Sequence, residues 1–566
     1  MASDNPFVPP KKKLNIIWWI GGAILLLVCL FLFQLIGPSP PIIISKQTTY
    51  ITDPLLPSGI PNYEEYLRRK LREGVTPENN AAVLLFEALW PSELDPSQYK
   101  AVARELGLKE IPSAEFAMKS PHGEANRKRV AAWMPQPSQD NLDSGLAAEP
   151  DLVIDAAAEH PWTSAQIPPL AAWVKENEGP LDLIVEASHR PRYYSPSPTL
   201  IDDQHDMLIS MMLPGVQAVR DGVRGLNLRA MQHIGENRPD KAWQDILAMY
   251  RLSSLVAQGS TLVEQLVAIA IRSIAFRATG ALLSSDKLPK ELAQQIQKDL
   301  EAIQPLANVA SCVDQNERLC GLNAIVHLKM HGLSQLNALT DGGNSERSPI
   351  DFLSVDWNVA LRKLNQAYDE AAAAMKLPPG DERQQALGQF ESNLSADQRS
   401  VKQPGRLLPA IVSRGARSDL AGSIIQALML PALNAAISAE ERANSMLSLA
   451  QVAAALAVYR AEHGAYPEKL DELVPGTLAK LPVDIFHGKP LVYKRVDEGY
   501  LLFSLGLNGQ DDGGSNSLMQ IFAGQPTESM EPGEAEAVRS KIPGSADDFS
   551  IRLPIKPFEM PKPRTE

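Results

Sequence analysis

Basic and aromatic side chains are concentrated in one short segment of the sequence, between residues 189 and 194. The segment reads His-Arg-Pro-Arg-Tyr-Tyr, and its proline favours an extended backbone. Guanidinium and phenol groups in such a segment could line a cleft that binds an anionic ligand or a sugar. The alternative, which we favour, is an extended strap whose tyrosines pack on the protein body. The candidate ligand-binding residues are His189, Arg190, Arg192, Tyr193 and Tyr194.

Two histidines, His327 and His331, stand four residues apart in a segment that we expect to be helical. This spacing can place two imidazoles on one metal ion. The glutamate of a His-Glu-x-x-His motif is missing between them, and the sequence offers no evident third ligand. We therefore expect ordinary surface histidines at these positions.

Asp314, Glu317 and Arg318 fall within the same expected helix and could act as catalytic carboxylates with an arginine clamp. We prefer a simpler interpretation, an ion pair on the helix surface between Asp314 and Arg318 at i, i+4. The sequence contains no Walker A loop, no Gly-x-Gly-x-x-Gly and no Gly-x-Ser-x-Gly, and its histidines are too sparse to indicate a triad. The sequence therefore indicates no catalytic residues, and we do not expect an enzyme.

The composition is that of a folded, acidic protein. The chain has 566 residues, of which 44% are hydrophobic and 21% charged, enough apolar material for buried cores. Its net charge is -13, which repels nucleic-acid phosphates and excludes nucleic acid as an expected partner.

The chain has three cysteines, of which Cys29 lies in an apolar N-terminal stretch. Cys312 and Cys320 would lie about 12 Å apart along the axis of one helix. A disulfide needs Cα atoms within about 7 Å, so a bridge would require the helix to break between them. We expect two buried thiols.

Residues 14–36 contain no charged side chain. A helix of this length spans roughly 35 Å, enough to cross a hydrocarbon core of about 30 Å. Lysines at 11–13 precede it, and the next charged residue is Lys46, so the positive-inside rule places the N-terminus in the cytoplasm and the body outside. The run ends without a small-residue cleavage site, which favours an uncleaved signal-anchor.

The region after the anchor predicts a mainly helical body. Residues 37–62 are rich in proline and isoleucine, typical of an extended tether. Further on, residues 220–233 and 242–256 predict two amphipathic helices around a polar turn. In the second, a core-facing stripe at i, i+3, i+4 and i+7 is formed by Trp243, Ile246, Leu247 and Tyr250.

A second apolar stretch covers residues 420–437. It is apolar enough for a short membrane span, but it contains Gln426 and Pro431. We favour a buried core helix. If the stretch did cross the membrane, the C-terminal part of the chain would return to the cytoplasm.

The C-terminal part of the chain resembles a known family over residues 420–515. The matching features, in order, are an apolar helix, a long amphipathic helix over 439–463, and short motifs at 463–467, 481–484, 488–493 and 499–514. Together they resemble the major pseudopilin (G-type) of the type II secretion system. The residues themselves predict short strands at 491–493 and 500–503 joined by a turn at 497–499. We expect a small α+β module, a long helix on a short antiparallel sheet.

In that family the last loop binds calcium through carboxylates and backbone carbonyls, and the resemblance carries this expectation over to Asn508, Asp511 and Asp512. Calcium takes about six to eight oxygen ligands. The later acidic positions of the family are occupied here by serine and asparagine at 515–517. The alternative, which we favour, is a solvated Gly/Asp turn.

The resemblance is incomplete at the point where pseudopilins are processed. The Gly-Phe cleavage motif and the glutamate that follows it are missing before Ile424, and the apolar helix is internal. We therefore expect a module that is not extracted into a filament. The whole chain is also similar to an uncharacterised group of bacterial membrane-anchored proteins, through residues 74–81 and 190–194. That resemblance implies a bacterial inner membrane, with the body on the periplasmic side. It does not indicate an activity.

The expected fold is mainly α with the small C-terminal α+β module. The expected order is a cytoplasmic tail (1–13), a transmembrane helix (14–36), a tether (37–62), a helical extracytoplasmic body (63–405), the pseudopilin-like module (406–525) and a Pro-rich tail (526–566). We expect a non-enzymatic envelope protein that binds protein partners. The alternatives are a membrane-tethered hydrolase or carbohydrate-binding enzyme with a cleft near 189–194, and a calcium-stabilised scaffold.

Overall fold

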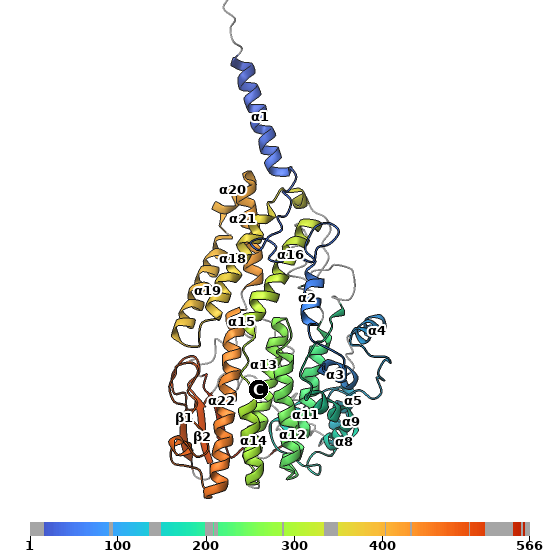
Figure 1. The fold of residues 1–566 in the computed structure, drawn as a ribbon, viewed down its shortest axis with the longest axis vertical. Coiled ribbons are helices and arrows are strands. Elements are labelled where there is room, and N and C mark those ends of the chain that lie inside the picture. The colour runs from blue at the N-terminus through green and yellow to red at the C-terminus, as the bar shows by residue number, and fades with distance from the viewer. Residues whose placement is uncertain are drawn as a thin grey trace, which may run out of the picture. The chain divides into compact units, whose positions relative to one another are not determined.

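The protein is mainly α-helical, with one small three-stranded antiparallel sheet and an apolar helix near the N-terminus, as the sequence predicts (Figure 1). The computed structural model describes residues 16–89, 94–134, 149–198, 208, 213–285, 288–332, 335, 349–401, 403–430, 433–496, 499–515, 547–555 and 558–560.

The chain forms two compact units, each assembled from separate stretches. Unit 1 contains Met1–Pro61, Gly321–Ala367 and Ser392–Leu430. Unit 2 contains Asn62–Cys320, Tyr368–Glu391 and Pro431–Glu566. The expected boundary between body and module at residues 405 and 406 falls inside unit 1, because residues 392–430 associate with the N-terminal stretch.

Unit 1 begins with helix α1 (Ile16–Ile36), 21 residues that are apolar except for Gln34. It also contains the 3-10 turn Pro349–Phe352, α20 (Pro404–Val412), α21 (Arg414–Met429) and parts of α16 (Arg318–His331), α18 (Trp357–Met375) and α19 (Asp381–Val401).

The segment expected to be a tether is packed within unit 1. Its Thr48 and Thr49 are buried. Asn365 Nδ2 donates to Thr48 O at 2.7 Å, and Lys329 Nζ donates to Pro40 O at 2.6 Å. Residues 37–61 are therefore part of the folded unit, because their backbone carbonyls are satisfied by side chains of α16 and α18.

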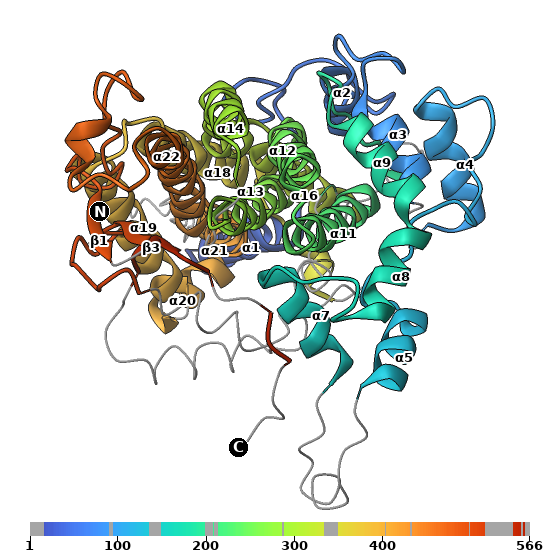
Figure 2. The same ribbon diagram turned by 90° about the horizontal axis from the view of Figure 1, so that it is seen from below.

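Before its C-terminal part, unit 2 is mostly helical (Figure 2). The helices there are α2 (Tyr63–Leu71), α3 (Ala81–Leu89), α4 (Pro96–Glu105), α5 (Glu124–Trp133), α7 (Pro150–Glu159), α8 (Pro168–Glu176), α9 (Glu178–Ala187), α11 (Pro214–Gly235), α12 (Pro239–Val256), α13 (Leu262–Leu283), α14 (Lys290–Ala302), α15 (Val309–Cys312) and the π-helical turn η2 (Val313–Glu317).

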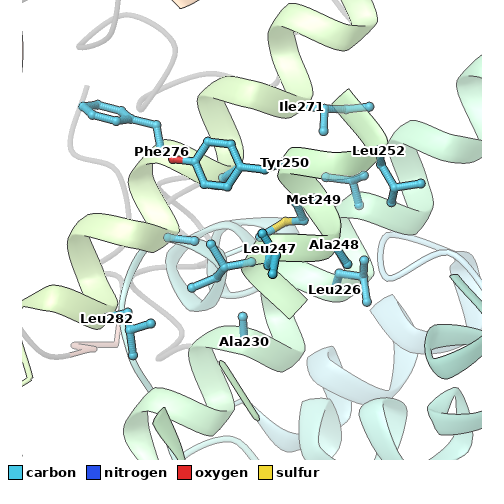
Figure 3. Close-up of a cluster of buried hydrophobic side chains, with 14 of the residues drawn as sticks. Leu226, Ala230, Leu247, Ala248, Met249, Tyr250, Leu252, Ile271, Phe276 and Leu282 are labelled. Atoms are coloured by element: carbon cyan, nitrogen blue, oxygen red, sulfur yellow. The ribbon is translucent and has the colours of Figure 1, made fainter. Parts of the chain in front are cut away.

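The core of unit 2 is built on α11, α12 and α13. The helices predicted at 220–233 and 242–256 lie within α11 and α12, and the predicted stripe from Trp243 to Tyr250 is buried. Figure 3 shows this cluster, with Leu226, Leu247 and Ile271 contributed by the three helices. Thr261 starts α13 by a capping box with Glu264.

The C-terminal part of unit 2 is a long helix with a small sheet. Helix α22 (Leu433–His463) packs on strands β2 (Gly499–Ser504) and β3 (Phe549–Leu553), and β1 (Val492–Val496) completes the order β1-β2-β3. The predicted long helix lies within α22, which begins six residues earlier than expected, and the two predicted strands overlap β1 and β2. The residues at 497–498 of the expected turn lie outside the described part of the chain.

Strand β3 lies in the region expected to be a Pro-rich tail, so that expectation needs correction. Phe549, Ile551 and Leu553 are buried, and β3 pairs antiparallel with β2, Leu502 opposite Ile551. The alternation of apolar residues is the period of a strand, but five residues followed by a proline gave too short a pattern to predict one.

The apolar stretch at 420–437 is divided between two helices. Helix α21 ends at Met429 and α22 begins at Leu433. In the described part of the chain, two helices are long and apolar enough to cross a membrane, Trp19–Ile36 and Leu262–Leu283. The second is α13, which is 67% buried over that range and belongs to the core of unit 2. The single core helix expected over 420–437 is thus replaced by parts of two helices, in which Ile425 and Ile437 are buried and Leu428 is exposed.

The cysteines of the body are free and buried, as expected. The thiol of Cys312 donates to Ser260 O at 2.9 Å. Burial raises the pKa values of Cys312 and Cys320 above the ordinary value, so both thiols stay protonated near neutral pH.

Candidate functional site

The segment between residues 189 and 194 follows α9 and is tied to the start of α3. The guanidinium of Arg190 donates to Pro77 O at 2.7 Å and to Asn80 O at 2.9 Å. The backbone of Arg192 accepts from Ala81 N at 2.8 Å and donates to Asn79 O at 3.1 Å. These four hydrogen bonds join the segment to residues 77–81.

The two tyrosines of the segment are buried, each with about one twentieth of its surface exposed. Asn80 clamps the backbone of Tyr194, since its Nδ2 donates to Tyr194 O and its Oδ1 accepts from Tyr194 N, both at 2.9 Å. Gln258 of the α12–α13 connection bonds Tyr193 N and Pro191 O, both at 3.1 Å. The segment is therefore an extended strap, because its backbone groups bond to Asn80 and Gln258 and its tyrosines are buried.

His189 is exposed, as are Pro191 and Arg192. The ring of His189 lies 3.2 Å from the guanidinium of Arg251. Partial burial and this positive charge lower its pKa, which favours a neutral imidazole. The cavities next to Tyr193 have volumes of about 20 Å³, room for one water molecule and too little for a sugar.

A larger cavity of about 440 Å³ lies elsewhere in unit 2. Its lining includes Leu89, Met118, Asn126, Arg129, Trp173 and Glu176. Arg129 and Glu176 form a bidentate ion pair with N–O distances of 3.1 and 2.9 Å. The described lining residues contain no histidine or cysteine, and their ionisable side chains are Lys119, Glu124, Arg129, Glu176 and Asp221. Sequence reasoning did not single out this cavity.

The loop that follows β2 brings acidic side chains together. Its glycines Gly506, Gly509, Gly513 and Gly514 have φ between 63° and 74°, which turns the backbone tightly. Asp512 in this loop meets Asp547 and Asp548 at the start of β3. One oxygen atom from each of these three carboxylates lies within 4.8 Å of the other two, so the three could hold a metal ion together. Among the described residues, these three form the group of His, Cys, Asp or Glu side chains with that geometry.

Backbone amides hold the carboxylates of this acidic cluster in place. Asp548 Oδ2 accepts from Asp512 N and Gly514 N, both at 2.9 Å, and Asp547 Oδ2 accepts from Leu507 N at 2.8 Å. Burial raises the pKa of Asp547, and it raises the pKa of Asp548 to about 6. The raised pKa values show that burial disfavours the charged form of these carboxylates. Three carboxylates held close together in this way are a suitable ligand set for a hard divalent cation, whose charge would offset that effect.

The calcium residues expected from the resemblance are only partly in this cluster. Asn508 donates from Nδ2 to Asp512 Oδ2 at 2.9 Å, at the edge of the cluster. Asp511 pairs instead with Lys494, at 2.9 Å. The sequence did not identify Asp547 and Asp548, because they stand more than thirty residues after the loop; the adjacent aspartates before an alternating apolar run were the available signal.

The ion pair expected between Asp314 and Arg318 is present, at 2.7 Å. Arg318 is not on the surface, however, since only 1% of its side chain is exposed. It also bonds Asp369 at 2.8 Å and lies over the ring of Tyr368. Glu317 accepts from Leu262 N at 2.9 Å, at the start of α13. These residues hold helices together.

His327 and His331 stack on one another, with ring centroids 4.0 Å apart. His331 Nδ1 lies 3.1 Å from His327 O. Neither belongs to a metal-type cluster in the described part of the chain.

Comparison with protein-family models, with curated proteins and with solved structures found no match to this chain.

Proposed function

We propose that this protein is a single-pass, membrane-anchored envelope protein. The observation that carries the proposal is α1, an apolar helix of 21 residues whose span from Trp19 to Ile36 is not buried within the protein. An exposed helix of this kind is stable only in an apolar medium. The lysines at 11–13 support a cytoplasmic N-terminus, and we propose that the body lies on the periplasmic side of a bacterial inner membrane.

The body would act through protein partners and not through catalysis. The strap at 189–194 uses the Arg190 side chain and both tyrosines within the fold, which weakens the alternative of a hydrolase or sugar-binding cleft there. The C-terminal part forms a long helix with a small antiparallel sheet, a fold that supports an interaction module there.

Crosslinking in intact cells tests this proposal. After mild crosslinking and extraction from membranes with detergent, the full-length protein should be recovered from the membrane fraction with a specific partner. Recovery as a lone monomer at every crosslinker concentration would contradict the partner-binding role. Release from membranes by alkaline carbonate would contradict the anchor.

A second candidate function is that of a calcium-stabilised scaffold. The acidic cluster of Asp512, Asp547 and Asp548 favours it, since it supplies carboxylates that the loop alone lacks. Calcium bound there would join the loop to β3 and hold the edge of the sheet. Melting curves that coincide in calcium and in chelator would remove this candidate.

A further inference from the structure

Helix α20 presents its apolar side chains to the outside. In a helix, residues at i, i+1, i+4 and i+5 share one face. The residues at these positions are Leu407, Leu408, Ile411 and Val412, exposed to 48, 67, 58 and 56%. A contiguous apolar face of this kind marks a surface that is covered by something apolar.

The polar side chain of α20, Arg406, faces the protein. Arg406 pairs with Asp397 of α19, 3.2 Å away, and with Asp419 of α21. It also donates to Ser400 Oγ at 2.6 Å, while Ala410 is buried. A surface helix of a soluble protein turns its apolar face to the core. Helix α20 is docked the other way round, and its polar contacts fix it in that orientation.

Within unit 1, α20 also contacts α1, at the C-terminal end of that helix (Figure 1). Arg414, just after α20, donates to Phe33 O at 3.0 Å, and its guanidinium lies 5.2 Å from the Phe33 ring centroid. Arg417 donates to Gln34 O at 2.6 Å. These arginines satisfy carbonyls of the last helical turn, where a positive charge is also favourable for the helix dipole.

The depth of this contact follows from the length of α1. Its 21 residues span about 32 Å, close to the hydrocarbon thickness of about 30 Å. Phe33 and Gln34 therefore lie at the far boundary of the hydrocarbon. Interfacial amphipathic helices lie about 5–10 Å deep at this same boundary.

A second exposed apolar group adjoins the same end of α1. Phe352, in the turn Pro349–Phe352, is 72% exposed. Two residues later, Ser354 N donates to Leu35 O at 2.8 Å. Aromatic side chains are enriched at the membrane–water boundary.

We propose that α20, together with Phe352, inserts its apolar face into the lipid leaflet at the C-terminal end of α1. Unit 1 is then held against the bilayer at two places, and α1 cannot swing freely relative to it. This inference rests on the proposed function, because it requires α1 to cross the membrane.

Fluorescence quenching on the full-length protein, reconstituted in vesicles of phosphatidylcholine and phosphatidylglycerol, tests this proposal. An environment-sensitive dye is placed at Leu408→Cys, at Ser392→Cys on the exposed side of α19, or at the native Cys29 in α1, with Cys29→Ala in the first two. Lipids with a nitroxide near the headgroup should quench the dye at 408 several-fold more than the dye at 392. Aqueous iodide should show the reverse order.

The three positions separate the failures. A dye at 408 that iodide quenches and lipid does not, while Cys29 is quenched by lipid, would overturn the inference and leave the anchor intact. A dye at Cys29 that iodide reaches would overturn the anchor itself. Shielding of position 408 from both quenchers would mean that a protein surface, such as a second copy, covers α20, and would also overturn the proposal.

Discussion

At the scale of single residues, the burial of Asp548 determines how its charge affects stability and the proposed binding of calcium. Its pKa is raised to about 6 by burial. The unfolded value is near 3.9, so the folded state binds the proton more tightly. Stability contributed by this group is therefore present at low pH and is lost as the pH rises from about 4 to about 6. A bound calcium ion would compensate the charged form.

Replacement of Asp548 should separate these two effects. In chelator at pH 7, Asp548→Asn should unfold at the same temperature as the unmodified protein or higher, because the buried charge is gone while Oδ1 can still accept from Asp512 N and Gly514 N. In calcium at about 100 times Kd, the unmodified protein should gain about 2.7 kcal/mol and the variant should gain little. Calorimetry in calcium and in chelator measures both.

Asp511→Asn is the matched control, since its carboxylate pairs with Lys494 and not with the cluster. It should keep the calcium response of the unmodified protein. Equal loss of the response in both variants would argue against a site at Asp512, Asp547 and Asp548.

At the scale of elements, one buried ion pair joins α11 to α12 within their apolar contact. Arg229 bonds Asp245 through Nε at 3.0 Å and Nη2 at 2.7 Å, and both side chains are buried. Arg229→Met would leave the Asp245 carboxylate without its cation, at a cost of about 3 to 5 kcal/mol in unfolding free energy. Arg69→Met, which breaks an exposed pair with Glu65, should cost less than about 1 kcal/mol. Urea unfolding followed by circular dichroism compares the two; similar losses would contradict this account.

Strand β3 gives a second test at this scale. Ile551 is 4% exposed, so Ile551→Ala should cost about 2 to 5 kcal/mol. The neighbouring Arg552 is exposed, and Arg552→Ala should change stability by less than about 0.5 kcal/mol. Hydrogen exchange of β2 amides, read by mass spectrometry, should accelerate only in the first variant. Unchanged exchange would mean that β3 does not hold β2.

These elements also show what the sequence could predict. The stripe from Trp243 to Tyr250 predicted α12 correctly, because helical periodicity is a local property. Spacing also predicted the pair of Asp314 with Arg318, but not its burial, which depends on what packs over it. Asp547 and Asp548 were missed for the same reason, since their partner Asp512 is brought close only by the pairing of β3 with β2.

At the scale of the whole molecule, the proposed topology has one crossing of the membrane. Helix α13 is a core helix, and the stretch at 420–437 is divided between α21 and α22, which leaves α1 as the candidate for a crossing helix among the described residues. Exposed positions early and late in unit 2 should therefore lie on the same, periplasmic side. Cys312 and Cys320 are buried and Cys29 lies in α1, so the native thiols should compete little with an introduced cysteine.

Labelling of intact spheroplasts with an impermeant maleimide tests this topology. Glu110→Cys and Met560→Cys, both at exposed positions of unit 2, should react without lysis. Lys12→Cys, which precedes α1, should react only after lysis and serves as the control for membrane integrity. Reaction of position 560 only after lysis would require a second crossing between 110 and 560, with residues 420–437 as the segment that makes it. Reaction of all three positions without lysis would instead argue against a cytoplasmic N-terminus, and would identify α1 as a helix that enters the membrane from the periplasmic side.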